Sequence, residues 1–200
     1  TFTWDYINPL AQMHYLSTRA PAFSTLMEAV PENGKGHVIM YMDEYTPGNI
    51  LRPDAGRTTM AVYYTVLQWP AHVHQNPSGW LTVGILRSSI LARLPGGLSN
   101  LMKRILNIMY PSQGSNMEVG FSIFDPSQNR NRIVRLGFWG FIGDEKAIKD
   151  VYAAKGAAGT ACCTMCKNVV STAHGDPSQH DESGYLVNIE ELDADRFDLY

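Results

Sequence analysis

Two apolar runs that each finish on an aspartate place the strongest constraint on how this chain folds. Residues 37–42 are apolar, rich in β-forming side chains and bounded by turn-forming residues, and Asp43 follows them directly. Residues 133–142 form a second such run, which is followed by Gly143 and Asp144. Ligands of an open α/β sheet gather at the carboxyl ends of its strands, so both aspartates are expected to face one crevice.

The rest of the chain alternates between strand-like and helix-like patterns, which predicts the α/β class with a mixed sheet. The order is strand, strand, strand, helix, strand, helix, with a short additional strand before the last long one. The expected strands are 37–42, 58–69, 80–86, 118–124 and 133–142, and the expected helical segments are 8–30 with a break at Pro21, 88–110 with a break at 95–97, and 145–154.

Composition supports one sizeable domain with an appendage. Of the 200 residues, 44% are hydrophobic and 18% are charged, which suffices for a buried core and is too apolar for a disordered chain. We expect a helical lead-in over 1–36, the core over 37–156, and a Cys-containing insertion with an acidic tail over 157–200. No stretch approaches the roughly 18 apolar residues of a membrane helix, so no membrane partner is expected.

Charge is unevenly distributed along the chain. Residues 1–150 hold 13 Lys and Arg against 11 Asp and Glu, whereas residues 151–200 hold 3 against 8. A nucleic-acid enzyme usually presents a basic surface, so the net charge of −3 argues mildly against one. The acidic excess is confined to the tail, which weakens that argument.

The paired aspartates suit a hard divalent cation. Mg²⁺ prefers oxygen ligands and uses one or two protein carboxylates, and two such ions about 4 Å apart serve phosphoryl transfer. Glu44 also follows the first run, but the two-residue period of a strand directs it to the opposite face. The simpler interpretation is that Asp43 begins a turn and Asp144 caps a helix.

Three cysteines lie close together, and two of them, Cys163 and Cys166, form a CxxC pair. This odd, clustered set is a poor disulfide framework and favours an intracellular, reducing compartment. A CxxC supplies two of the four ligands of a structural Zn²⁺ site, and His174 is a candidate for a third. Buried thiols or a redox pair are the alternatives, but a redox CxxC normally opens a helix after a strand.

Residues 40–49, followed by a Tyr-rich strand, resemble the first catalytic strand of eukaryotic DDE transposases of the CACTA and Plavaka kind. Residues 141–145, the helix after them and residues 155–166 resemble the second catalytic block, in which a Gly-Asp closes a strand and a Cys-rich knuckle follows. The resemblance spans roughly residues 37 to 170, and its motifs are short.

This resemblance implies a five-stranded RNase H-like sheet, incomplete in this chain, and a metal-dependent enzyme that cleaves and transfers DNA strands with Mg²⁺ or Mn²⁺. It assigns Asp43 and Asp144 as the first two catalytic acids, with DNA as partner and the nucleus as location. No motif supports Glu190 or Glu191 as the third acid, so we expect the chain to be part of a longer protein that carries it. Self-association into a homo-oligomer is left open.

Three other functions remain open on the sequence. The first is a non-catalytic, domesticated DNA- or protein-binding domain that retains the fold and a structural zinc. The second is a metal-dependent phosphatase or nuclease without a transposon origin. The third is a thiol-redox module that uses Cys163 and Cys166.

Overall fold

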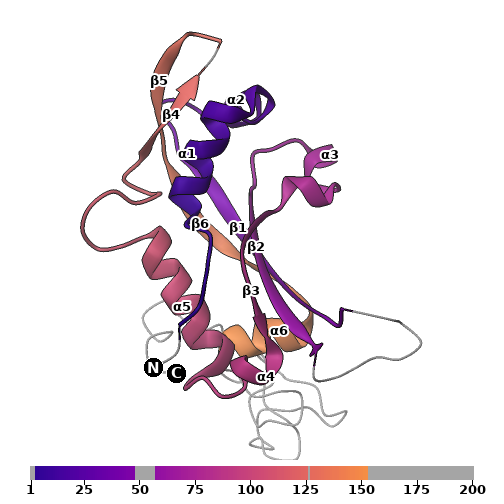
Figure 1. The fold of residues 1–200 in the computed structure, drawn as a ribbon. Helices are drawn as coiled ribbons and strands as arrows, with labels where there is room; N and C mark the ends of the chain where they lie inside the picture. Colours follow the sequence, from indigo (N-terminus) through magenta and orange to yellow (C-terminus); the bar gives the residue numbers. More distant parts are fainter. Residues whose placement is uncertain (1–2, 48–56, 126, 153–200) are drawn as a thin grey trace, which may run out of the picture.

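A four-stranded mixed sheet forms the centre of the molecule (Figure 1). The computed structural model describes residues 3–47, 57–125 and 127–152. The sheet has the order β3-β2-β1-β6; β1 pairs antiparallel with β2, β2 antiparallel with β3, and β1 parallel with β6. The strands are β1 (Gly36–Tyr45), β2 (Thr59–Val66), β3 (Leu81–Arg87) and β6 (Leu136–Ile142). The predicted α/β class with a mixed sheet is therefore confirmed.

The hairpin of β4 (Phe121–Asp125) and β5 (Arg130–Val134) forms a separate two-stranded sheet that extends beyond one end of the main sheet (Figure 1). The prediction that residues 118–124 add a strand to the main sheet was wrong, as was the prediction of one strand over 133–142. The chain leaves the hairpin at Arg135, whose carbonyl accepts a hydrogen bond from Gly36 N at 2.8 Å. Both halves of the run are apolar because each packs on a different part of the core, so periodicity could not reveal the break.

The helices begin and end close to the predicted breaks. Pro21 occupies the first turn of α2, and Gly96, with a φ of 73°, immediately precedes α5. The segment 70–79, between two of the expected strands, contains the short α3 and a 3-10 helix, η2. None of the described helices is long and apolar enough to cross a membrane. The helices are α1 (Pro9–Arg19), α2 (Pro21–Met27), α3 (Ala71–His74), η2 (Pro77–Gly79), α4 (Ser88–Leu91), α5 (Gly97–Met109) and α6 (Glu145–Val151).

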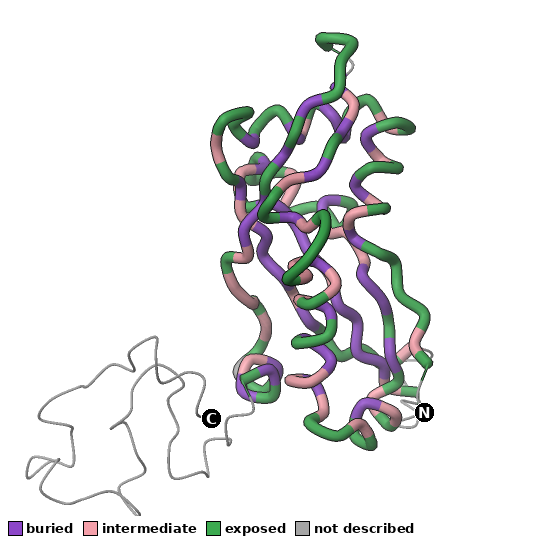
Figure 2. Tube along the Cα trace, turned by 90° about the vertical axis from the view of Figure 1, so that its left-hand side faces the viewer, coloured by how far each residue is buried: buried purple, intermediate pink, exposed green. Residues whose placement is uncertain are grey.

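One face of the sheet, here called the helix face, is buried under α1, α2 and α5. Side chains alternate along each strand, so Met40 and Met42 of β1 lie on this face together with their neighbours Tyr64 and Val62 of β2. The Tyr64 hydroxyl lies 3.1 Å from Gln12 Oε1 and anchors α1 to the sheet. Figure 2 shows the buried strand segments running through the length of the molecule. Helix-side members of the same core include Met13, Met27, Leu101, Met102 and Ile105.

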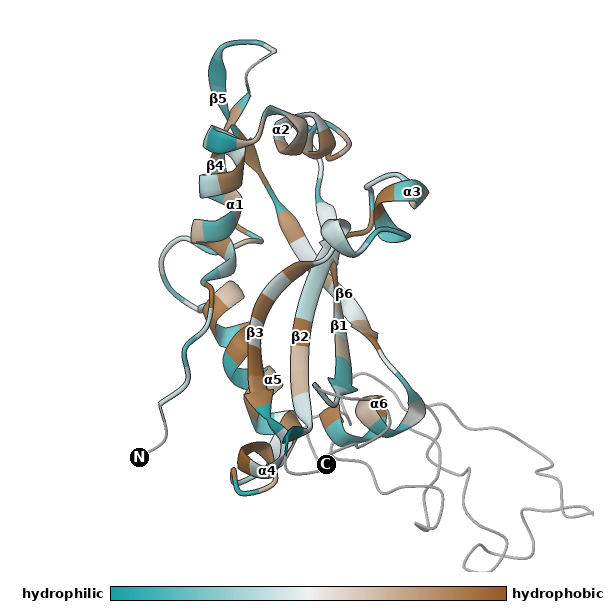
Figure 3. Ribbon diagram, turned by 45° about the vertical axis from the view of Figure 1, so that its right-hand side comes forward, coloured by the Kyte–Doolittle hydropathy of each residue, from teal (hydrophilic) through white to brown (hydrophobic). Residues whose placement is uncertain are grey.

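The opposite face of the sheet, here called the open face, is covered at one end by α3 and η2 (Figure 3). Thr65 Oγ1 donates to Gly79 O at 2.9 Å there. Elsewhere on this face apolar side chains stay accessible: Ile85 is 54%, Trp139 65% and Ile142 48% exposed. The described helices therefore leave part of the open face accessible to solvent.

Candidate active site

Asp43 lies within a paired strand, which fixes its backbone. β1 continues to Tyr45, three residues beyond the expected strand 37–42, and Asp43 pairs across from Ala61 of β2. The interpretation of Asp43 as the start of a turn is therefore wrong. Alternation along β1 places Asp43 on the open face with Tyr41, and its residue is exposed. A carboxylate on a hydrogen-bonded strand is held more rigidly than one in a loop.

Asp144 caps α6, as the sequence predicted. Its Oδ1 accepts a hydrogen bond of 2.7 Å from the backbone N–H of Ala147, and its backbone is extended, as is typical of a cap. This bond uses one carboxylate oxygen. Oδ2 makes no hydrogen bond to any residue that the structure describes, so the cap and a metal ligand are compatible roles for this side chain.

Asp43 lies on β1, and Asp144 lies two residues past the end of β6, the parallel strand beside β1. Tyr41 of β1 pairs with Ile142 of β6, and each aspartate follows its strand residue by two positions. Gly143 lies against β1, because a Cβ on it would be 3.5 Å from Met42 O. The two segments thus remain side by side past the last paired residues, and both carboxylates are brought to the same end of the sheet.

Both carboxylates affect the pKa of the Tyr41 phenol. Burial raises the pKa of this phenol above its usual value, and a hydrogen bond to Asp43 together with the negative charges of Asp43 and Asp144 raises it further. A hydrogen bond raises a tyrosine pKa in this way when the hydroxyl donates to the carboxylate. The Tyr41 hydroxyl therefore stays protonated next to the negative charge of Asp43.

Aromatic rings form a wall beside the aspartates on the open face. The rings of Tyr41 and Tyr63 stack, with centroids 6.2 Å apart and planes 22° apart, and Trp80 lies 5.6 Å from Tyr41. Burial raises the pKa of Tyr63, and the charges of Tyr45 and Asp43 add to this effect. The packed rings restrict the orientation of the Tyr41 phenol.

Glu44 belongs to a different contact. Its Oε2 lies 3.5 Å from Lys146 Nζ of α6, and both side chains are largely accessible. An exposed ion pair of this kind contributes about 0.2–1 kcal/mol at most. Glu44 therefore ties the end of β1 to the helix that Asp144 caps, and does not join the two aspartates.

Two exposed arginines lie at the same end of the sheet. Arg87 pairs across from Thr59, which in turn pairs with Tyr45 of β1, and Arg57 lies two residues before the start of β2. The end of the sheet that carries the aspartates thus also carries positive charge, which suits an anionic substrate.

The described residues contain no group of three or more His, Cys, Asp and Glu positioned to hold a metal ion. Asp43 and Asp144 supply two carboxylates, which fits the one or two that Mg²⁺ usually takes from a protein. The zinc site predicted at Cys163, Cys166 and His174 lies outside the described residues and stays a prediction. Glu190 and Glu191, which no motif supports as a third acid, also lie outside the described residues.

Sequence reasoning missed the aromatic residues of the site. Tyr63 was placed only within the expected strand 58–69, and Tyr41 only within the motif of residues 40–49. The signal was present: Tyr41 precedes Asp43 by two positions, which puts both on one face of a strand. The stacking partner Tyr63 depends on the antiparallel register, which the sequence does not give.

A scan against protein-family models and a search of curated proteins each returned no match to this sequence. The functional argument therefore rests on the geometry of the chain itself.

Proposed function

We propose that this chain is an RNase H-like catalytic domain of the DDE transposase type, which cleaves and transfers DNA strands with divalent ions held by Asp43 and Asp144. One observation carries the proposal. Asp43 lies on β1, Asp144 follows the end of the parallel neighbouring strand β6 by two residues, and the negative charges of both raise the pKa of the Tyr41 phenol. Paired carboxylates at strand ends suit a shared hard cation.

The order of elements supports the same proposal. The main sheet consists of three antiparallel strands followed, after α4 and α5, by a strand parallel to the first and then by α6. This is the predicted succession of strand, strand, strand, helix, strand and helix, with the β4–β5 hairpin inserted before the last strand. The insertion leaves the pairing of β1 with β6 intact.

The residues of the site suit phosphodiester chemistry. Bound divalent ions activate a water or a DNA 3′-hydroxyl and stabilise the leaving oxygen. Asp43 and Asp144 supply carboxylate oxygens, and the Tyr41 hydroxyl keeps Asp43 oriented through its hydrogen bond. Arg57 and Arg87 provide positive charge for the phosphates beside the scissile one.

The experiment is a DNA cleavage assay with the purified protein and Mg²⁺ or Mn²⁺. Asp43→Asn and Asp144→Asn are expected to lower the rate at least about 100-fold, because each removes a charged metal ligand. Glu44→Gln is the matched control and is expected to keep the activity within a few-fold. Cleavage at the unmodified rate by Asp43→Asn would refute the assignment, and DNA binding without cleavage by the unmodified protein would favour the non-catalytic alternative.

A further inference from the structure

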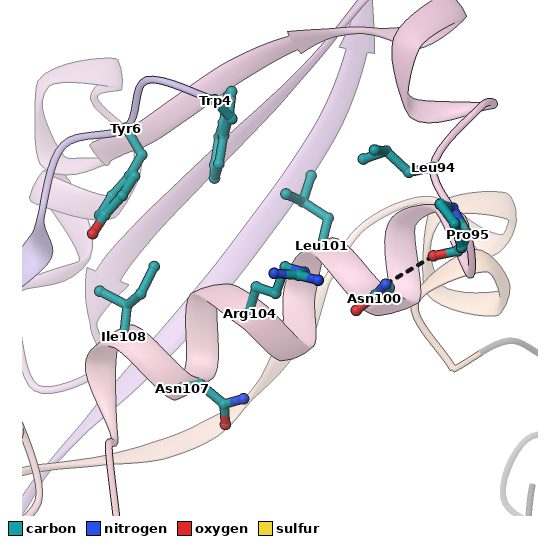
Figure 4. A pocket seen from close by; sticks show the side chains of 9 residues that line it. All are labelled: Trp4, Tyr6, Leu94, Pro95, Asn100, Leu101, Arg104, Asn107 and Ile108. Atoms are coloured by element: carbon teal, nitrogen blue, oxygen red, sulfur yellow. Dashed lines mark hydrogen bonds between the residues drawn. The ribbon is translucent and has the colours of Figure 1, made fainter. Parts of the chain in front are cut away.

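A groove separate from the two aspartates lies between the N-terminal segment and α5 (Figure 4). Its volume is about 820 Å³, within the range of sites that bind small molecules. Trp4 and Tyr6 form one wall, and Leu101, Arg104 and Ile108 of α5 form the facing wall.

The aromatic wall is anchored to the sheet. Backbone Ile7 N donates to Val83 O at 2.7 Å, and the Trp4 indole N–H donates to Ile85 O at 2.9 Å. The rings of Trp4 and Tyr6 stack with centroids 5.9 Å apart and an angle of 29° between their planes. The wall is thus a preformed aromatic platform of two stacked rings, and Tyr6 remains 42% exposed.

Polar groups face this platform from α5. Asn100 Nδ2 donates to Pro95 O at 2.8 Å, which fixes the amide and leaves its Oδ1 as an acceptor. The Arg104 guanidinium makes no ion pair or hydrogen bond with any residue in 3–47, 57–125 or 127–152. Asn107 adds a further amide to the lining. The groove therefore combines a stacking surface with one cation and two amides.

The surroundings of the groove are positively charged. Residues 55–117, which include β2, β3, α4 and α5, contain five Lys and Arg and no Asp or Glu. Asp5 separates Trp4 and Tyr6 in the sequence, but it is exposed and does not line the groove. The charge of this region is complementary to a polyanion.

We infer that this groove binds a single-stranded segment of nucleic acid, with a base stacked on Trp4 and Tyr6 and a phosphate paired with Arg104. Aromatic rings can stack on any base, and amides can hydrogen-bond to base edges. In a duplex the faces of the bases are stacked on one another, so they cannot reach an aromatic platform. The choice of nucleic acid over other anions also rests on the proposed function. The site itself is independent of Asp43 and Asp144.

The test measures binding of a fluorescently labelled oligothymidine to the complete chain by anisotropy at several salt concentrations. Arg104→Gln is expected to weaken binding about fivefold and to reduce the slope of log K against log salt by about 0.7, because one phosphate contact is lost. Tyr6→Leu is expected to weaken binding about fivefold or more through lost stacking. Lys103→Gln removes the same charge from the neighbouring position of α5, outside the groove, and is expected to change affinity less than twofold.

Three results would overturn the inference: equal effects of Arg104→Gln and Lys103→Gln, duplex binding as tight as single-strand binding, or equal competition by polyglutamate of the same charge. Tyr6 and Arg104 are exposed, and circular dichroism with thermal unfolding verifies that each variant folds.

Asp43→Asn separates the two proposals. If the groove alone is wrong, the groove variants bind normally while Asp43→Asn still loses cleavage; if the proposed function alone is wrong, Asp43→Asn cleaves normally while Arg104→Gln still binds weakly.

Discussion

At the scale of single residues, the Tyr41 phenol is the group that connects the two aspartates. A hydrogen bond to Asp43 and the charge of Asp144 raise its pKa, and its ring packs against the rings of Tyr63 and Trp80. Groups that orient a metal ligand through a hydrogen bond strongly affect ion affinity without touching the ion. Tyr41 is therefore a positioning residue of the proposed site.

Tyr41→Phe is expected to weaken Mn²⁺ binding about tenfold, because Asp43 loses the donor that orients it. Isothermal titration of the protein with Mn²⁺ measures the effect. Tyr63→Phe is the matched control, since it removes a neighbouring phenol from the same stack and is expected to leave the affinity nearly unchanged. Equal losses in both variants would show that packing of the rings, and not the hydrogen bond, matters.

Asp144 has two separable roles, because an asparagine can replace its cap but not its charge. Asp144→Ala is expected to lower the free energy of unfolding by about 1 kcal/mol, since the Ala147 N–H loses its partner. Asp144→Asn is expected to stay within about 0.5 kcal/mol of the unmodified protein, because asparagine caps helices equally well. Urea unfolding of both variants measures the difference, and equal losses would contradict the cap assignment.

At the scale of elements, the β4–β5 hairpin holds the end of α2 by polar contacts that a hydrophobic pattern does not reveal. Buried Arg132 donates from Nη2 to the carbonyl of Met27, the last residue of α2, and from Nη1 to Val30 O, three residues past the helix, at 3.1 Å. Asp125 closes the hairpin turn by accepting from the Ser127 hydroxyl at 2.7 Å and from two backbone N–H groups.

Asp125 is expected to make the stability depend on pH in acid. The Ser127 hydroxyl lowers the pKa of its carboxyl most, backbone N–H groups of Gln128 and Ser127 and the charge of Arg132 lower it further, and burial opposes them. A carboxyl with a lowered folded pKa stabilises the fold above its unfolded pKa of about 3.9, and this stability is lost as the pH falls through the folded pKa.

Asp125→Asn should therefore lose less stability than the unmodified protein between about pH 5 and pH 2. Urea unfolding across that interval measures the two curves. Asparagine keeps an acceptor for the turn, so the comparison isolates the titration from the hydrogen-bond geometry. Parallel curves for the two proteins would mean that Asp125 carries no share of the acid sensitivity.

The helix and strand predictions were correct where a single hydrophobic periodicity extends over the whole element. The strand beginning near residue 37, the helices broken at Pro21 and at 95–97, and the cap at Asp144 were confirmed. The run over 133–142 was not resolved, because Val134 at the end of β5 and Leu136 at the start of β6 are both buried in the core, although the two strands belong to different sheets. Strand pairing was equally hidden, since it depends on contacts between distant segments.

At the scale of the whole molecule, the N-terminal segment is part of the core and not a separate lead-in. It runs beside β3, and Gly84 gives the Trp4 indole room to pack, because a Cβ at Gly84 would lie 2.4 Å from Trp4 Cζ2. Met13, Phe23 and Met27 enter the same buried cluster as the strands. Composition along 8–30 predicted helices but carried no information about where they dock.

Gly84→Ala is therefore expected to lower the free energy of unfolding by about 1–3 kcal/mol, because the added methyl group displaces Trp4. Gly140→Ala is the control in a strand of the same sheet, where a Cβ would meet nothing within 4 Å, and is expected to cost much less. Chemical denaturation measures both. A Gly84 variant as stable as the Gly140 variant would show that Trp4 does not depend on this contact.

The central claim, that Asp43 and Asp144 share a divalent ion, is tested most directly by the Mn²⁺ affinity of the Asp144→Asn variant, followed through the paramagnetic resonance signal of free Mn²⁺. The folded variant is expected to bind Mn²⁺ at least about tenfold more weakly than the unmodified protein, because the cap survives while one charged ligand is lost. An unchanged affinity in the folded variant would contradict the claim and leave Asp144 as a helix cap alone.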